Sequence, residues 1–152
     1  MDQAGLLKEI EAILDTLLIE TRASRGTLRA DDPDRAWHSD VPCAEVLRDG
    51  APSMRHDGSV NHRAAETIQW IIRTNAILKQ EDLREVRPAP PRALMDIYLA
   101  KAQMVGPLII GGKVYGWISA HEIKSPRRWS DADVIAMEKA LAKVARLLNA
   151  RR

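Results

Sequence analysis

The 152-residue chain contains no phenylalanine, and aromatic residues make up only 4% of it. Its one cysteine, Cys43, can form neither an internal disulfide nor a cysteine-based metal site. No stretch approaches the roughly 18 consecutive apolar residues of a membrane span, and the acidic start MDQAGLLKEIEAILD is unlike a signal peptide. These absences exclude disulfide-stapled and membrane-spanning classes, and we expect a protein of the reducing cytoplasm.

A large excess of charge is also missing. The formal net charge is +2, from 23 basic and 21 acidic residues. This near balance gives no electrostatic reason to expect direct binding of nucleic acid or of a membrane surface. Hydrophobic residues account for 45% of the chain, an ordinary globular share. The length fits one domain, and we predict a single domain over residues 1–152.

Both ends of the chain predict amphipathic helices. The first carries Leu7, Ile10, Leu14 and Leu17 at helical spacing and fades after Thr21. Ser130, with Asp133 three residues later, predicts a capped start for the last helix. That helix has a heptad seam of Val134, Met137, Leu141, Val144 and Leu148. Seams this narrow predict a homodimer, and the alternative is that both seams face their own sheet.

The middle of the chain predicts strands and short helices. Strands are expected over residues 26–30, within 41–47, over 76–78, and in a hairpin of 104–110 and 114–120 around Gly111 and Gly112. Asn61 is expected to cap a helix beginning near His62, and residues 92–99 to form one or two helical turns. Two terminal helices around an antiparallel sheet are typical of the α+β class.

The second hairpin strand has two chemically different faces. Val114, Gly116, Ile118 and Ala120 share the small, aliphatic one, whereas Tyr115, Trp117, Ser119 and His121 share the other. A two-residue turn predicts that Leu108 lies opposite Tyr115, Gly106 opposite Trp117, and Met104 opposite Ser119. Aromatic walls with a hydroxyl and an imidazole are typical of a ligand pocket. The alternative is that Tyr115 and Trp117 are core or surface residues without a ligand.

These motifs resemble the GAF domain family. Residues 105–121 are similar to the family's hairpin, residues 128–133 to the opening of its last helix, and residues 67–78 to its middle helix and following strand. The resemblance implies a GAF-like antiparallel sheet with the N- and C-terminal helices on one face. It places short helices and a ligand pocket on the other. It also implies a small-molecule sensor whose terminal helices pair in a homodimer.

The resemblance also implies where a ligand would bind. The expected ligand-binding residues are Trp70, Arg92, Met95, Tyr98, Met104, Tyr115, Trp117, Ser119 and His121. Residues 84–98 are expected to form a lid in which Arg92 binds an anion; a surface role for Arg92 is the alternative. Arg29 and Arg73 are outside candidates, and His62 shares a helix face with Trp70 by spacing.

Differences from known members of the family exclude several ligands and one activity for this chain. A chain without phenylalanine lacks the cyclic-nucleotide signature, and residues 92–101 lack the Cys or His by which bilin-binding members hold their chromophore. One cysteine is too few for the redox cycle of free methionine sulfoxide reductases. His62 and Glu66 form an i, i+4 pair without a third metal ligand.

We therefore expect no enzyme, no metal and no cofactor. The leading hypothesis is a GAF-type sensory domain that binds a small molecule of unknown class. It would act through its terminal helices on a separate kinase or transcription factor. The alternative is a ligand-free dimerisation or protein-interaction module. A small redox enzyme is a third reading, and it would require an activity that depends on Cys43.

Overall fold

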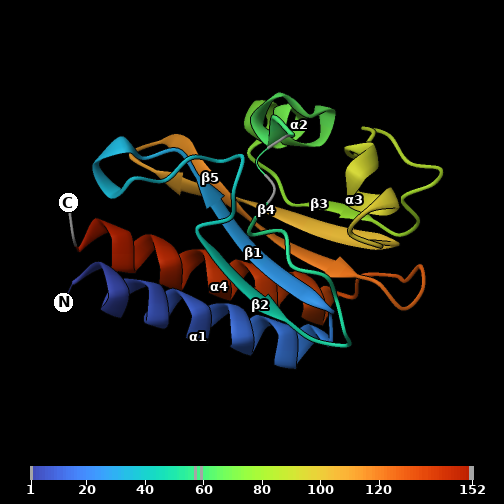
Figure 1. The fold of residues 1–152 in the computed structure, drawn as a ribbon, viewed down its shortest axis with the longest axis horizontal. Helices are drawn as coiled ribbons and strands as arrows, with labels where there is room; N and C mark the ends of the chain where they lie inside the picture. Colours follow the sequence, from blue (N-terminus) through green and yellow to red (C-terminus); the bar gives the residue numbers. More distant parts are fainter. Residues whose placement is uncertain (1, 57, 59, 151–152) are drawn as a thin grey trace.

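The computed structural model describes residues 2–56, 58 and 60–150. Its elements are α1 (Gln3–Thr21), β1 (Arg25–Ala30), η1 (Pro33–Arg35), β2 (Ala44–Leu47), η2 (His62–Ala64), α2 (Glu66–Thr74), β3 (Leu78–Gln80), α3 (Arg92–Asp96), β4 (Ala102–Ile110), β5 (Lys113–Glu122) and α4 (Asp131–Asn149) (Figure 1). Each predicted helix and strand is present, with ends displaced by a few residues.

The strands form one antiparallel sheet in the order β2-β1-β5-β4-β3. The long terminal helices α1 and α4 lie side by side against one face, and α2 lies on the opposite side (Figure 1). The predicted α+β class and the GAF-like arrangement are therefore confirmed. None of the helices in the described ranges is both long and apolar enough to cross a bilayer.

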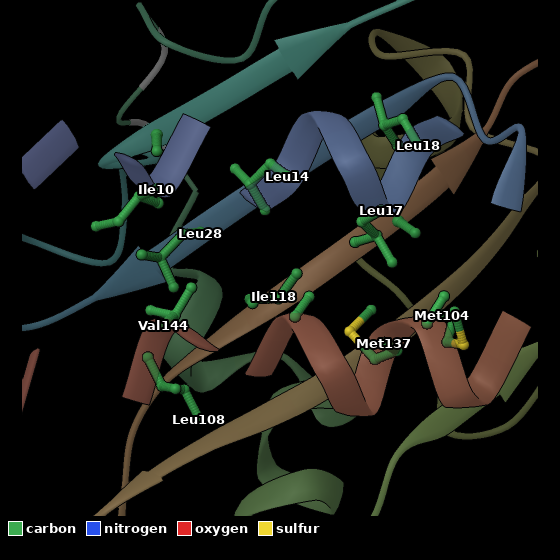
Figure 2. Close-up of a cluster of buried hydrophobic side chains, with 14 of the residues drawn as sticks. Ile10, Leu14, Leu17, Leu18, Leu28, Met104, Leu108, Ile118, Met137 and Val144 are labelled. Atoms are coloured by element: carbon green, nitrogen blue, oxygen red, sulfur yellow. The ribbon is translucent and has the colours of Figure 1, made fainter. Parts of the chain in front are cut away.

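The main core lies between the terminal helices and the sheet. Leu14 and Leu17 of α1 and Met137 and Val144 of α4 meet a sheet face that includes Ile118 (Figure 2). The predicted seams are therefore buried within the chain, so they do not by themselves indicate a second copy. In α4 the stripe includes Ala136 and Ala140, whose small side chains permit close packing, and Val134 and Leu141 lie half-buried at its edges.

Local signals define the element ends as predicted. The Ser130 hydroxyl accepts from the Asp133 backbone N–H at 3.1 Å, and the Asp133 carboxylate accepts from the Ser130 N–H at 2.9 Å, which completes a capping box. Gly111 and Gly112 have φ angles of 61° and 77°. Two consecutive positive φ angles are what a primed hairpin turn requires, and glycine adopts them without strain.

A β-bulge changes the predicted register of the hairpin. Ile109 pairs with Val114, but Leu108 pairs with Gly116, so Tyr115 is an extra residue. Beyond it every partner differs by one from the prediction: Val105 lies opposite Ser119, and Met104 opposite Ala120. The predicted pairs were wrong because counting from the turn assumes an uninterrupted ladder.

Candidate ligand-binding site

The sheet face turned away from the terminal helices carries buried charged and polar side chains. Arg25 and Arg29 on β1 are 0% and 3% exposed, and His121 on β5 is 4% exposed. In the β1–β5 register, Arg25 lies beside His121 and Arg29 beside Trp117, with Thr27 and Ser119 between them. Strand alternation therefore places this polar set on one face and the aliphatic core on the other.

A small cavity lies over this face. Arg29, Gln103, Trp117, Ser119 and His121 line its sheet side, and Met54, His62, Ala65, Thr67, Ile68, Pro91, Leu94 and Val105 complete the lining. Its volume is about 20 Å³, which is room for one or two water-sized groups. A ligand larger than this requires the covering segments to move.

Arg25 holds His121 in one protonation state. Its Nε donates to His121 Nδ1 at 2.9 Å, and its two terminal nitrogens donate to the carbonyls of Pro52 at 2.8 Å and Tyr98 at 3.1 Å. Burial, followed by the charges of Arg25 and Arg29, lowers the pKa of His121 well below its usual range. A neutral imidazole that accepts at Nδ1 carries its proton on Nε2, so His121 is a hydrogen-bond donor at the cavity.

Arg29 is less fully engaged. Its Nη1 donates to the Ser39 carbonyl at 2.9 Å, and the only partner of its Nη2 among the described residues is the Met54 sulfur at 3.9 Å. Burial lowers the pKa of Arg29 to about 10, which leaves it cationic at neutral pH. Among the described residues, no carboxylate lies within 4 Å of Arg29 or of Arg25.

The nearby buried acid, Glu45, is engaged elsewhere. Its carboxylate accepts from the Ser53 hydroxyl at 2.5 Å and from the Met54 N–H at 2.8 Å, and it lies 3.5 Å from Arg55 Nε. Arg55 therefore offsets its charge at the protein surface. The positive charge beside the cavity has no anion in direct contact with it within the described part of the chain.

Gln103 adds an acceptor to the cavity wall. Its Nε2 donates to Gln80 Oε1 at 2.8 Å, and Gln80 Nε2 donates to the Pro88 carbonyl at 2.7 Å. This chain fixes both amide orientations and leaves Gln103 Oε1 to accept a hydrogen bond. The cavity thus combines a cation, an N–H donor, a hydroxyl and an acceptor with apolar walls.

The edge of the cavity is held down by Arg63 of η2. Its Nε lies 2.5 Å from Asp31 Oδ2, and its guanidinium carbon is 5.3 Å from the centre of the Trp117 ring. Asp31 also accepts from the Ser39 N–H at 2.7 Å. The start of the α2 region is therefore tied to the loop after β1, directly over the indole.

The structure brings three of the predicted site residues together at the cavity: Trp117, Ser119 and His121. Tyr98 lies one step away, with its carbonyl on Arg25 and its ring centre 5.7 Å from that guanidinium. Of residues 84–98, Pro91 and Leu94 line the cavity.

The other predicted site residues lie elsewhere. Met104 faces the terminal helices, and Tyr115 packs toward the same core with its hydroxyl on Asp32 at 2.5 Å. Arg92 is exposed and lies 3.8 Å from Asp96. Met95 lines a separate surface groove, and Trp70 packs beside the cavity cluster without lining the cavity. The bulge explains the first two errors, because it shifts β4 by one residue and turns Tyr115 out of the alternation.

Arg29 and Gln103 line the cavity, but neither was predicted from the sequence as a main ligand-binding residue. Arg29 was only an outside candidate, and Gln103 was missed. The available signal was the spacing of Arg25, Thr27 and Arg29, which share one face of a strand whose residues are all buried. Within the described residues, no group of three His, Cys, Asp or Glu side chains is placed to hold a metal ion.

Replacing His121 with glutamine is expected to reduce the loss of stability in acid. Because the folded pKa of His121 lies below its usual 6.5, the unfolded chain binds the extra proton as pH falls through that value. Each bound proton changes stability by up to about 1.4 kcal/mol per pH unit. Glutamine still accepts from Arg25 but does not titrate.

Urea unfolding at several pH values between about 5 and 6.5 measures this difference. His38→Gln is the control, since the His38 side chain is 74% exposed. Equal pH slopes for the wild type and His121→Gln would contradict a buried neutral imidazole.

The GAF domain family model matches residues 6–149. The fold resembles the GAF domain of the cyanobacteriochrome TePixJ, with a TM-score of 0.76, 17% identity, and 94% of this chain and 88% of the other covered. It also resembles the far-red absorbing dark state of JSC1_58120g3, described with bound biliverdin IXa, with a TM-score of 0.67, 14% identity and 96% of each chain covered.

A third similar structure is the type II free methionine-R-sulfoxide reductase from Thermoplasma acidophilum. It has a TM-score of 0.70 and 13% identity, with 96% of this chain and 94% of the other covered. At these identities the likenesses show the fold alone. No curated protein matches the chain.

Proposed function

The chain belongs to the GAF domain family, and we propose that residues 1–152 form a single sensory domain that binds a small molecule in the cavity beneath α2. The polar wall of that cavity is the observation that carries the proposal. Arg29, Gln103 and His121 are each at least 95% buried, yet all three border the same cavity. Convergent polar groups among apolar walls are typical of a ligand site.

The sheet offers a direct route for the signal. On β5, Trp117, Ser119 and His121 line the cavity, while Ile118 and Ala120 pack in the core that includes α1 and α4. A ligand that shifts this strand therefore changes the surface on which the terminal helices rest. We propose that these helices pass the change to a separate kinase or transcription factor, and that the domain acts as a cytoplasmic homodimer.

A binding role fits the lone cysteine better than a redox role does. Burial raises the pKa of the Cys43 thiol to about 12, and its sulfur lies 3.2 Å from the Leu28 carbonyl. The thiolate is the reactive form, so a thiol that stays protonated is a poor redox nucleophile. We propose that the domain is not an enzyme. We also propose that its ligand is smaller than a bilin, because the cavity is only about 20 Å³.

The same small volume favours a second candidate function. A cavity that is nearly filled by its own side chains is also what a ligand-free dimerisation or protein-interaction module would have. The two candidates differ in whether any small molecule stabilises the folded state.

Thermal unfolding against a library of acids, anions, purines and aromatic compounds separates them. A ligand at 100 times its dissociation constant adds about 2.7 kcal/mol, which raises the melting temperature by several degrees. Ser119→Val is expected to abolish that shift, because one methyl group replaces the hydroxyl and a second is added, so both take up space in the cavity. Ser125→Val, on an exposed residue of the loop after β5, is expected to keep it.

The pattern of shifts decides between the candidates. A shift for one chemical class that only Ser119→Val removes supports the sensor. The absence of any shift across the library would favour the interaction module.

A further inference from the structure

We propose that the cavity recognises a short-chain organic carboxylate, whose oxygens bind Arg29 and the Nε2–H of His121. This inference rests on the proposed function and names the ligand class of the same site. Two guanidinium groups are buried on one sheet face, and no carboxylate of the described residues lies within 4 Å of either. The buried Glu45 contacts Arg55 instead, and the half-buried Asp40 acts on Arg29 only from beyond that distance.

Buried charges are costly unless an opposite charge or several hydrogen bonds offset them. Arg25 meets this requirement, because His121, Pro52 and Tyr98 accept from its three nitrogens. Arg29 does not. One of its terminal nitrogens reaches only a sulfur atom at 3.9 Å, which is a weak acceptor. Arg29 therefore has an Nη2 group that is available to donate to a ligand. Of the two buried arginines, Arg29 is the one that lines the cavity.

A carboxylate matches these donors in geometry as well as in charge. The planar guanidinium presents parallel N–H groups that suit two oxygens of one carboxylate. His121 lines the same cavity and offers a further N–H. A cation as ligand is disfavoured, because Arg25 and Arg29 both lie beside the site.

The remaining walls define the rest of the ligand. Gln103 Oε1 and the Ser119 hydroxyl suit a hydroxyl or other small polar group next to the carboxylate. Ile68, Leu94, Val105 and Trp117 surround these groups with apolar surface. The closed cavity holds only one or two water-sized groups, so even a two-carbon carboxylate requires the α2 cover to move. A chain of about two to four carbon atoms needs the smallest movement, which is why we propose a short-chain ligand.

The test is thermal unfolding and calorimetric titration with matched pairs of compounds at constant ionic strength. Acetate, propionate, lactate and pyruvate are compared with acetamide, propionamide, lactamide and pyruvamide, and with nitrate and phosphate. Purines, neutral aromatics and biliverdin complete the panel. At least one carboxylate is expected to raise the melting temperature by several degrees, and its amide is not.

Arg29→Met is expected to weaken carboxylate binding at least 100-fold while leaving the unliganded melting temperature equal or higher. Methionine has a similar length and removes a buried cation without an anionic partner. Arg48→Met is the matched control, because Arg48 pairs with Asp15 on the other side of the sheet. Arg29→Lys keeps the charge without the fork and is expected to bind with intermediate affinity; it serves as the test if the methionine variant does not fold.

Each outcome bears on one claim. Carboxylates that stabilise no better than their amides, or that still bind Arg29→Met, overturn the inference. Equal shifts with nitrate or phosphate also overturn it, in favour of a general anion site. If only neutral compounds raise the melting temperature, the carboxylate inference is wrong and the proposed sensory function is still supported. If no compound in the panel raises the melting temperature, both the carboxylate inference and the proposed sensory function are contradicted.

Discussion

Replacing Gly116 with alanine is expected to destabilise the fold by about 3 kcal/mol, near the upper end of the usual cost of overpacking. A Cβ atom at this position would lie 2.2 Å from the Arg29 carbonyl oxygen and 2.8 Å from the Ala30 Cβ. Strand β1 cannot simply move away, because β2 pairs with its other edge. The added methyl group therefore forces the backbone that carries Arg29 to shift.

Gly26→Ala is the matched control, since it is the same substitution on the neighbouring strand. The nearest atom to its added Cβ would be a Leu18 side-chain carbon at 3.4 Å, an ordinary contact. Urea unfolding of both variants measures the difference. A cost below about 1 kcal/mol for Gly116→Ala would contradict the close approach of β1 and β5.

Features that depend on a few adjacent residues could be predicted from the sequence. The Ser130 capping box, the Gly111-Gly112 turn and the two terminal helices are present as expected. Each is set by hydrogen bonds or backbone angles within a few positions, so the residues that specify it are visible in one short window.

Features that depend on pairing between distant segments could not be predicted in the same way. The bulge at Tyr115 leaves no sequence signal that a count from the turn would detect, and it moved Met104 from the cavity face to the core face. Shifting one strand by a single residue reverses the direction of every side chain on it.

The apolar seams of the two terminal helices could not be assigned to a partner surface from the sequence. Leu14 and Val144 fit a coiled-coil pattern, yet both are fully buried within one chain. A sheet face and a second helix select similar apolar spacing, so periodicity alone does not identify the surface that a helix covers.

The candidate site could be predicted in part. Trp117, Ser119 and His121 followed from alternation along one strand, which is a local property. Arg29 joins them only because β1 pairs with β5, across almost ninety intervening residues. Sequence reasoning therefore found the aromatic and imidazole wall and undervalued the cation that gives the cavity its charge.

Replacing Trp117 with alanine is expected to cost about 3–5 kcal/mol, the usual range for removing a buried tryptophan. The side chain is 1% exposed and packs with Ile68, Ile71, Leu78 and Val105. The substitution leaves a void beside the cavity and also removes the ring over which Arg63 lies. Urea unfolding measures the cost. Trp70→Ala is the control, because Trp70 packs against the same cluster but is only partly buried and lies outside the cavity lining.

The Trp117→Ala result also bears on how the site works. If the indole is a wall between the cavity and α2, its removal enlarges the space beside Arg29, so longer carboxylates should bind the variant better, relative to acetate, than they bind the wild type. Trp117→Phe keeps an aromatic wall and should retain the wild-type preference at a smaller stability cost. Equal costs for Trp117→Ala and Trp70→Ala would mean that the indole is not the packing centre of this face. An unchanged preference for ligand length in a folded Trp117→Ala variant would mean that other groups set the size of the cavity.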